Sequence, residues 1–192
     1  MFTGIITHIG KLEKKENNIF AFSASRDLIE KLKKSESIAV NGCCLTIENL
    51  SSEMFSVEVM PETQQKTMLG LLKHGGVVNL ELPVSANSLL SGHIVQGHID
   101  GTGVIKTIQE NKNSRLLTIT LPKKLHRYVV EKGSVCINGV SLTVINTGND
   151  YFTVGIIPYT WKHTMFHILK IGEQVNIEVD ILAKYVEKLL AK

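Results

Sequence analysis

The chain has 192 residues, of which 43% are hydrophobic and 20% are charged, a composition typical of globular proteins and unlike that of disordered or collagen-like chains. The formal net charge at pH 7 is only +3 and no run of like charge occurs, which argues against a nucleic-acid-binding protein. Residues 1–8 lack the leader of a signal peptide, and no window approaches the roughly 20 apolar residues of a membrane span, so we expect a cytoplasmic protein with no membrane partner.

In chain order, the first half is predicted to consist mainly of short strands. Alternating or continuous apolar runs indicate strands at Ile19–Ala24, Phe55–Val59 and Val77–Leu82, and a helix is predicted over Arg26–Lys34. Asn41-Gly42 stands between two apolar runs, which predicts a two-residue hairpin of type I′.

The second half shows the same order of elements after the serine-rich stretch Ser85–Gly92, which is typical of a linker. Its predicted elements are the strands Leu117–Leu121, Phe152–Ile157 and Val175–Val179, a type I′ hairpin at Asn138-Gly139, and a helix over Lys123–Glu131 with Pro122 before it and Gly133 after it.

An internal repeat explains this likeness. Ser37–Ile47 recurs as Ser134–Val144 at a constant shift of 97 positions. Near the start, Gly4–Gly10 pairs with Gly97–Gly103 at a shift of 93, so the second copy carries a four-residue insertion, which we place at Gln109–Ser114. The repeat therefore predicts two homologous all-β domains, residues 1–88 and 89–182, each a small antiparallel barrel.

The tail has no counterpart in the first half. The tail from Leu182 to Lys192, with residues 183–192 as its separate C-terminal unit, is predicted to form an amphipathic helix whose apolar stripe is Leu182, Val186, Leu189 and Leu190. Such a stripe must be buried either on its own barrel or on further copies of the chain, and the sequence leaves both options open.

The strands that follow the two Asn-Gly turns each have one apolar and one polar face. Side chains alternate along a strand, so Cys43, Leu45 and Ile47 share one face while Cys44 and Thr46 share the other. Val140, Leu142 and Val144 match the first face, and Ser141 and Thr143 match the second. Small hydrogen-bonding side chains suit a heteroaromatic ligand, although a plain solvated strand face has the same composition.

Chemically active side chains are few. Cys44 is a candidate nucleophile with His98 or His93 as base; the alternatives are a small buried cysteine and structural histidines. The three cysteines, Cys43, Cys44 and Cys136, show no CxxC spacing, which indicates free thiols and no metal site. Phosphate-binding glycine motifs are absent from the sequence, so no nucleotide cofactor is expected.

Five ordered blocks resemble the riboflavin synthases: Met1–Ile5, Asn41–Thr46, Gly92–Asp100, Asn138–Thr143 and Val175–Asp180. The resemblance implies two six-stranded Greek-key β-barrels in tandem plus a C-terminal helix that forms a homotrimer. It implies an enzyme that needs no cofactor or metal and passes a four-carbon unit between two molecules of 6,7-dimethyl-8-ribityllumazine. The products would be riboflavin and 5-amino-6-(D-ribitylamino)uracil. Lumazine synthase is a further candidate partner.

The resemblance also implies an active site between the N-terminal barrel of one subunit and the C-terminal barrel of the next, with one lumazine in each barrel. Contacts of the N-terminal barrel fall on Gly4, Ile5, Ile6, Cys44, Leu45, Thr46, Glu58, Val59, Met60, Pro61, Glu62 and Thr63. Contacts of the C-terminal barrel fall on Gly97, His98, Ile99, Lys132, Ser141, Leu142, Thr143, Ile156, Ile157, Pro158, Tyr159, Thr160 and Trp161. Residues matching those implicated in turnover are Phe2, Cys44, His98, Ser141 and Asp180.

Two departures and two rival functions bear on this interpretation. Asn138 stands where many relatives carry an aspartate, so we expect a plain turn residue there, and Tyr159–Trp161 is bulkier than usual. A non-catalytic lumazine- or flavin-binding protein is the main alternative, but such relatives lose the cysteine pair and the histidine-glycine block that this chain keeps. A small-barrel nucleic-acid-binding module is disfavoured by the weak charge.

Overall fold

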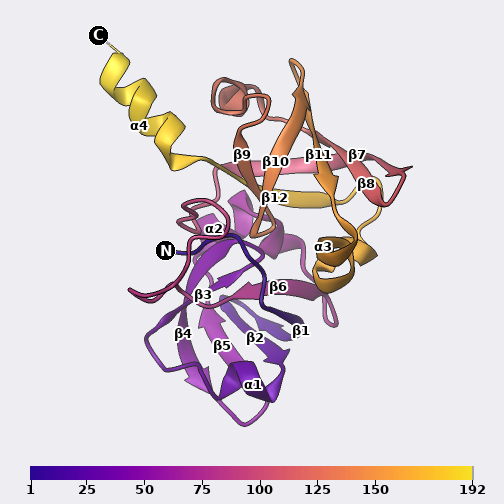
Figure 1. Ribbon diagram of the computed structural model, residues 1–192. Helices are drawn as coiled ribbons and strands as arrows, with labels where there is room; N and C mark the ends of the chain where they lie inside the picture. The colour runs from indigo at the N-terminus through magenta and orange to yellow at the C-terminus, as the bar shows by residue number, and fades with distance from the viewer. Residues whose placement is uncertain (192) are drawn as a thin grey trace.

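Strands dominate the chain and close into two antiparallel barrels of six strands each, which confirms the predicted fold class (Figure 1). The computed structural model describes residues 1–191. In the first barrel the order around the wall is β1-β2-β5-β4-β3-β6. Its strands are β1 (His8–Glu16), β2 (Ile19–Ala24), β3 (Ser37–Val40), β4 (Cys43–Leu50), β5 (Met54–Glu58) and β6 (Val77–Glu81), with α1 (Arg26–Ile29), α2 (Pro61–Lys66) and the 3₁₀ turn η1 (Met68–Leu71) between them.

The second barrel repeats this wall in the order β10-β11-β8-β7-β12-β9. Its strands are β7 (Gly101–Asn111), β8 (Ser114–Thr120), β9 (Ser134–Ile137), β10 (Val140–Thr147), β11 (Tyr151–Ile156) and β12 (Gln174–Val179), with η2 (Lys123–Tyr128), α3 (Pro158–His163) and η3 (Met165–Ile168) between them. Among the described residues, no helix is long and apolar enough to cross a membrane.

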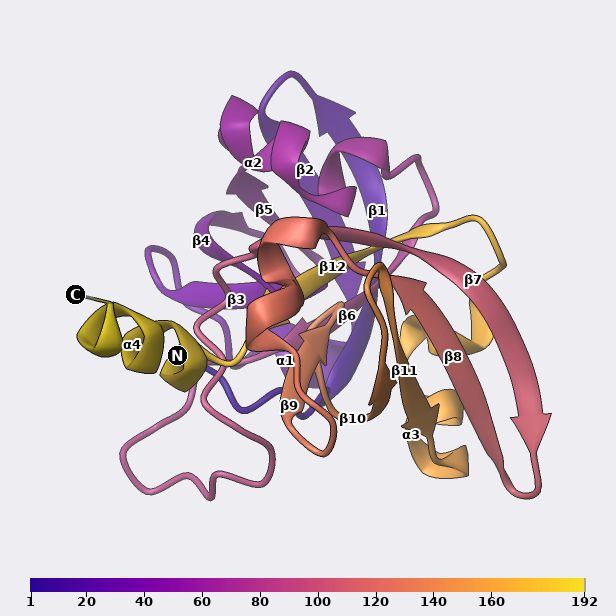
Figure 2. The ribbon, with the colours of Figure 1, turned by 90° about the horizontal axis from the view of Figure 1, so that it is seen from above.

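The predicted insertion lies where the pattern placed it. It lengthens the hairpin of β7 and β8, whose turn is at residues 112–113, and this hairpin extends well beyond its barrel (Figure 2). Both first strands bulge at equivalent points, between Leu12 and Lys14 and between Ile105 and Thr107.

The two predicted helices at 26–34 and 123–131 were wrong in length or type. α1 ends at Ile29, and the second segment is a 3₁₀ helix that ends at Tyr128. Each segment only has to bring a few apolar side chains, such as Leu28 and Leu125, over the mouth of its barrel. A single turn suffices for this, and short isolated helices are marginal.

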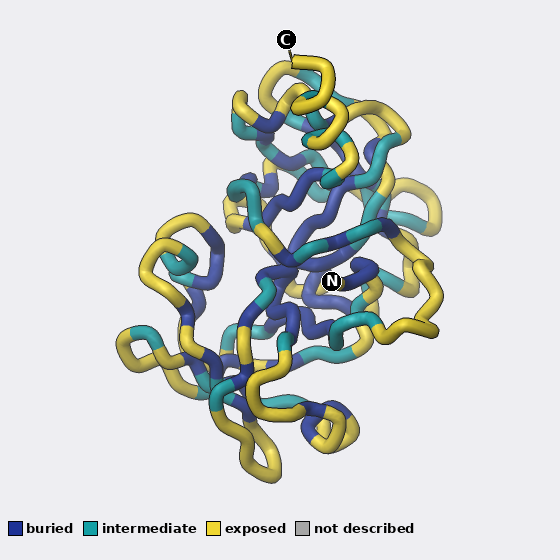
Figure 3. The backbone as a smooth tube through the Cα atoms, turned by 90° about the vertical axis from the view of Figure 1, so that its left-hand side faces the viewer, coloured by how far each residue is buried: buried dark blue, intermediate teal, exposed yellow. Residues whose placement is uncertain are grey.

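Each barrel has its own apolar core, so the halves are separate packing units. Phe20, Phe22 and Phe55 fill the first core, and Phe152 and Phe166 fill the second. The buried segments of the tube lie inside the two barrels and where they meet (Figure 3).

The barrels meet at their two Asn-Gly turns, and this corrects the expectation that Asn138 is a plain turn residue. Asn41 and Asn138 have φ of +46°, as type I′ turns require, but both are fully buried. Gly42 and Gly139 are in backbone contact, since a Cβ on Gly42 would lie 2.6 Å from the Gly139 nitrogen.

Four asparagines join the barrels around this contact in a two-fold pattern. The Asn41 Oδ1 accepts from the Asn79 N–H at 2.8 Å, and Asn79 Nδ2 donates across the interface to the Asn138 carbonyl at 2.8 Å. Asn138 and Asn176 repeat these bonds, with Asn176 Nδ2 donating to the Asn41 carbonyl at 2.8 Å. The network satisfies buried polar groups and sets one relative orientation of the barrels.

The C-terminal helix α4 (Ile181–Leu190) points away from both barrels (Figure 1). The predicted stripe is exposed, from 54% for Val186 to 83% for Leu189. Polar contacts hold the helix at its base, where Lys184 pairs with Asp100, and Glu187 bonds Arg127 and Tyr128. The apolar stripe is therefore not buried on its own barrel; Lys192, the last residue of the predicted helix, lies outside the described residues.

Candidate functional site

The polar faces predicted by alternation are present on β4 and β10. In β4, Cys43, Leu45 and Ile47 are buried, whereas Cys44 is half-buried and Thr46 is exposed. In β10, Ser141 is half-buried and Thr143 is exposed, and Val140 and Val144 are buried. Leu142 is only half-buried, at the edge of the second core.

Both polar faces lie at a slot in the barrel wall. β4 pairs with β3 through Cys43–Thr46 but pairs with β5 only from Ile47 onward. β10 likewise pairs with β9 through Val140–Thr143 and with β11 only from Val144 onward. One edge of each strand is thus left open to a ligand, with backbone donors and acceptors beside the small polar side chains.

Each slot is completed by a segment from the other repeat. Residues 2 and 95 form an antiparallel bridge between the barrels, in which the Phe2 N–H donates to the Val95 carbonyl at 2.7 Å. Beyond this bridge the Cys44 N–H donates to the Gly97 carbonyl at 2.9 Å, and the Ser141 N–H donates to the Gly4 carbonyl at 2.8 Å. The leading segment of each repeat therefore crosses over and lies against the polar strand of the other barrel.

This crossing corrects the expected grouping of the site residues by barrel. Gly97, His98 and Ile99 lie with Cys44 at the N-terminal barrel. Gly4 lies against Ser141 of the C-terminal barrel, and Ile6 packs on the second core, whereas Ile5 lines a hollow with Thr7 and His8 of the N-terminal barrel. Residues of one repeat can therefore line the slot of the other barrel. The local sequence does not show to which barrel the leading segment of a repeat bonds.

Two adjoining hollows of about 300 Å³ each mark the slot of the N-terminal barrel. Cys44 and Thr63 line both of them. The first also contains Glu62, Gly97, His98 and Ile99, and the second contains Leu45, Thr46, Glu58 and Met60. Among the described residues, no hydrogen bond joins His98 to Cys44, although both line the first hollow.

Two stretches expected to contact ligand, Glu58–Thr63 and Ile156–Trp161, lead from β5 into α2 and from β11 into α3. Met60, Ile157 and Tyr159 are exposed, and Thr63, Thr160 and Trp161 are half-buried. Pro61 and Pro158 begin the two helices. Val59 and Ile156, expected to contact ligand, instead have fully buried side chains in the two cores, so only their backbone is available to a ligand.

Ser141 has a basic partner that Cys44 lacks. His93 Nδ1 is hydrogen-bonded to Ser141 Oγ at 2.7 Å, and within the described part of the chain its Nε2 is buried without a partner. Burial lowers the pKa of His93, while the nearby Asp180 carboxylate opposes this shift. A neutral imidazole bonded to a hydroxyl can accept its proton, so the second slot contains a hydroxyl and base pair.

Three residues matched to turnover or binding have further contacts, and one of them, Asp180, also lies near His93 of the second slot. Phe2 is fully buried between the barrels beside Ala39, Val95 and Cys136, so it can act only through the position of its segment. Asp180 caps α4, accepting from the Leu182 N–H at 2.9 Å. Lys132 is exposed at φ +64° in the turn before β9.

Sequence reasoning missed two buried carboxylates, Glu81 and Glu178, which hold the crossing segments. Glu81 accepts from the N–H groups of Thr3 and Gly4, and Glu178 accepts from those of Gln96 and Gly97. The repeat offered a signal for them. The two glutamates are 97 positions apart, at equivalent places in the strands Val77–Glu81 and Gln174–Val179.

Comparison with known proteins agrees with this arrangement. Residues 3–83 and 96–180 each match the family model of the lumazine binding domain. The chain is 45% identical over 196 residues to the riboflavin synthase of Actinobacillus pleuropneumoniae and 40% identical over 195 residues to that of Bacillus subtilis, covering 100% of this chain and 91% of each relative. Solved structures of LumP, complexed with riboflavin or with 6,7-dimethyl-8-(1′-D-ribityl) lumazine, superpose with TM-scores of 0.85 and 0.83 at 26% identity, covering 93% of this chain and 99% of theirs.

Proposed function

The chain belongs to the riboflavin synthases, transferases of riboflavin biosynthesis with two lumazine-binding repeats, and on this premise we propose that it converts two molecules of 6,7-dimethyl-8-ribityllumazine into riboflavin and 5-amino-6-(D-ribitylamino)uracil. A four-carbon unit passes from one lumazine to the other. No metal or organic cofactor takes part, because the C7 methyl group of the substrate is itself acidic.

One observation carries the proposal: a single chain contains two slots with the same frame and different chemistry. Each slot has an open strand edge, a small polar face and a crossing segment from the other repeat. One slot contains the thiol of Cys44, and the other contains the Ser141 hydroxyl on His93. Two identical substrates that play different parts, one as donor and one as acceptor, require sites that differ in this way.

The slots would act mainly by orientation and proton transfer. The pyrimidinedione edge of a lumazine ring offers the alternating donors and acceptors that an open strand edge can bond. The Thr46 and Thr143 hydroxyls stand on the same face and add side-chain bonds. Cys44, Ser141 and His93 then supply the groups that move protons or activate a nucleophile towards C7.

We propose that the working form is a homotrimer, with the active site between the N-terminal barrel of one subunit and the C-terminal barrel of the next. The stripe of α4 supports self-association, because Leu182, Leu189 and Leu190 are each more than half exposed among the described residues. The exposure of Lys132 in the turn before β9 supports a contact with a ligand held between subunits.

The partner and the compartment are further proposals. We propose lumazine synthase as an associated enzyme, to be tested by co-sedimentation of the two purified proteins. Cys43, Cys44 and Cys136 are free thiols, which suits a reducing compartment such as the cytoplasm.

The decisive experiment is to treat the purified protein with a chelator and incubate it with the lumazine alone. We expect riboflavin to accumulate, with one riboflavin for every two lumazines consumed. Binding of lumazine without any riboflavin would identify a non-catalytic lumazine-binding protein instead. Activity that appears only after a metal is added would contradict the cofactor-free reaction.

A further inference from the structure

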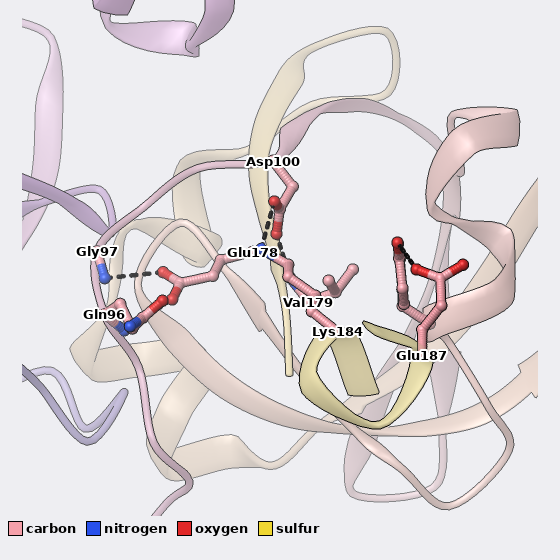
Figure 4. Close-up of polar contacts among 8 residues, drawn as sticks. Gln96, Gly97, Asp100, Glu178, Val179, Lys184 and Glu187 are labelled. Carbon is pink, nitrogen blue, oxygen red and sulfur yellow. Dashed lines mark hydrogen bonds and ion pairs between the residues drawn. The ribbon is translucent and has the colours of Figure 1, made fainter. Parts of the chain in front are cut away.

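Glu178 is a buried carboxylate of the C-terminal barrel that bonds the wall of the N-terminal slot (Figure 4). It lies on β12, is 2% exposed, and accepts from the Gln96 N–H at 2.7 Å and from the Gly97 N–H at 2.9 Å. The Gly97 carbonyl in turn accepts from the Cys44 N–H. The Glu178 carboxylate and the backbone of Gly97 therefore link β12 to the backbone of Cys44.

Glu81 makes the reciprocal contact. It lies on β6 of the N-terminal barrel, is 4% exposed, and accepts from the Thr3 N–H at 2.7 Å, the Thr3 hydroxyl at 2.9 Å and the Gly4 N–H at 3.1 Å. The Gly4 carbonyl accepts from the Ser141 N–H. Each barrel thus holds, through one glutamate, the segment that completes the slot of the other barrel.

The chemistry of the contact requires a carboxylate. Both oxygens of Glu178 face N–H donors, and only an ionised carboxyl group accepts at both oxygens without presenting a donor. The ionisable groups around it are Asp100 on the crossing segment, Lys184 on α4, and the buried thiols of Cys43 and Cys136. Burial raises the pKa of Glu178 to about 7, against the opposing effect of the two N–H bonds.

We propose that Glu178 is a positioning residue for the lumazine slot of the N-terminal barrel, holding Gln96 and Gly97 so that the wall beside Cys44 has one geometry. Glu81 has the same role for the Ser141 slot. This inference deepens the proposed function and rests on it for the identity of the ligand. The contacts themselves do not depend on the ligand.

The crossing segment that Glu178 holds continues to the C-terminal helix. Asp100, three residues after Gly97, accepts from the Val179 N–H at 3.0 Å and pairs with Lys184 of α4. Figure 4 shows Gln96 and Gly97 beside Glu178, and Asp100 beside Val179 and Lys184 of α4. The slot that contains Cys44 is therefore tied to the helix proposed to assemble the subunits.

The test compares Glu178→Gln with its repeat equivalent Glu81→Gln, using the alkylation rate of Cys44. The full-length protein is treated with iodoacetamide without substrate, and labelled Cys44 is quantified by peptide mass spectrometry. A glutamine amide places a donor against one of the two N–H groups, so Glu178→Gln should speed alkylation roughly fivefold, the ratio expected for one lost hydrogen bond. Glu81→Gln should leave the Cys44 rate unchanged. Equal rates in the two variants, or a wild-type rate in Glu178→Gln, would overturn the proposal.

A second measurement on the unaltered protein applies even if Glu178→Gln does not fold. Amide hydrogen exchange is followed between pH 6 and pH 8 and corrected for the intrinsic rate at each pH. Protection of the Gln96 and Gly97 amides should rise as Glu178 ionises, while the Asn41 amide, which donates to the Asn79 carbonyl, serves as control. Constant protection of Gln96 and Gly97 would refute the role of Glu178. Because neither readout uses substrate, this result is independent of whether the protein makes riboflavin.

Discussion

The two barrels share a frame and differ in what they hold at one equivalent position. Gly4 and Gly97 cross to the opposite barrel at φ of +78° and +81°, and a glutamate at the end of β6 or β12 fixes each crossing. The side chain that each crossing glycine touches is Ser141 in one slot and Cys44 in the other. The two repeats therefore share the backbone of the site, while the difference between Cys44 and Ser141 at one equivalent position separates the two chemistries.

The surroundings sharpen this difference. Ser141 is bonded to His93, whereas Cys44 faces a hollow lined by the exposed His98. The Cys44 slot connects to α4 through the pair of Asp100 and Lys184, whereas His93 of the Ser141 slot lies near Asp180, the N-cap of α4. Equal frames with unequal surroundings allow a direct test, because a change made in one barrel has its matched control in the other.

The largest effect is expected from removing the element that only one barrel carries. Deleting the residues after Ala183 removes most of the exposed stripe of α4. We expect a smaller species and a loss of turnover on the order of 100-fold, the scale of rate lost when reacting groups are misplaced. Sedimentation and a riboflavin assay measure the two outcomes. An intact trimer after the deletion would exclude α4 as the assembling element.

The next effect concerns the crossing glycines. A Cβ on Gly97 would lie 2.6 Å from the Cys44 Cβ, and a Cβ on Gly4 would lie equally close to the Ser141 Cβ. Gly97→Ala and Gly4→Ala should each destabilise the fold by about 2–4 kcal/mol, from overlap plus a left-handed backbone. Gly75→Ala, at φ +78° with nothing within 4 Å of the added carbon, measures the backbone contribution alone. If urea unfolding showed the same loss of stability at all three positions, steric overlap at the two crossing glycines would contribute nothing.

The pH dependence of stability should distinguish the two carboxylates from ordinary surface groups. Glu178 has a pKa of about 7 in the fold against its usual 4.5, so the folded state binds this proton more tightly than the unfolded state. The contribution of this group is therefore most favourable below about pH 4.5, and it declines by about 3 kcal/mol as the pH rises to about 7. Urea unfolding of wild type and Glu178→Gln across this range should show a shallower decline in the variant. Burial also raises the pKa of Glu81, so Glu81→Gln should act in the same direction.

The ionisation of Glu178 has opposite effects on the stability of the whole fold and on the order of the crossing segment. Ionisation of Glu178 lowers the stability of the fold but completes both bonds to the crossing segment. Protection of Gln96 and Gly97 should therefore rise with pH while global stability falls, which a purely structural carboxylate would not produce.

The smallest effects come from the polar face itself. Cys44→Ser should slow turnover by roughly tenfold or more, because a thiol is far more acidic than a hydroxyl, yet leave lumazine binding nearly unchanged. Thr46→Val should instead weaken binding by about 1 kcal/mol, the typical contribution of one hydrogen bond. Fluorescence titration with the lumazine and the riboflavin assay separate the two effects. A Cys44→Ser variant that turns over at the wild-type rate would leave β4 as a binding surface without a special thiol.

Much of the frame was predictable from the sequence because it depends on short-range rules. Asn41-Gly42 and Asn138-Gly139 required type I′ turns, and period-2 alternation placed Cys44 and Thr46 opposite the core. The insertion at Gln109–Ser114 followed from the change of shift between the repeats. The helices at 26–34 and 123–131 were wrong because their length is set by the mouth of a barrel, which no local pattern describes.

By itself, then, the sequence determined the two barrels, through the repeat, and also the turns and the polar faces, which depend on residues a few positions apart. Only the tertiary structure decided that Gly97 completes the slot of Cys44 and Gly4 that of Ser141. It also decided that Asn41 and Asn138 join the barrels, and that Glu81 and Glu178 bond the crossing segments. These contacts join residues 53 (Cys44 and Gly97) to 137 (Gly4 and Ser141) positions apart. They exist only because two closed barrels pack through their Asn-Gly turns, an arrangement that local periodicity cannot encode.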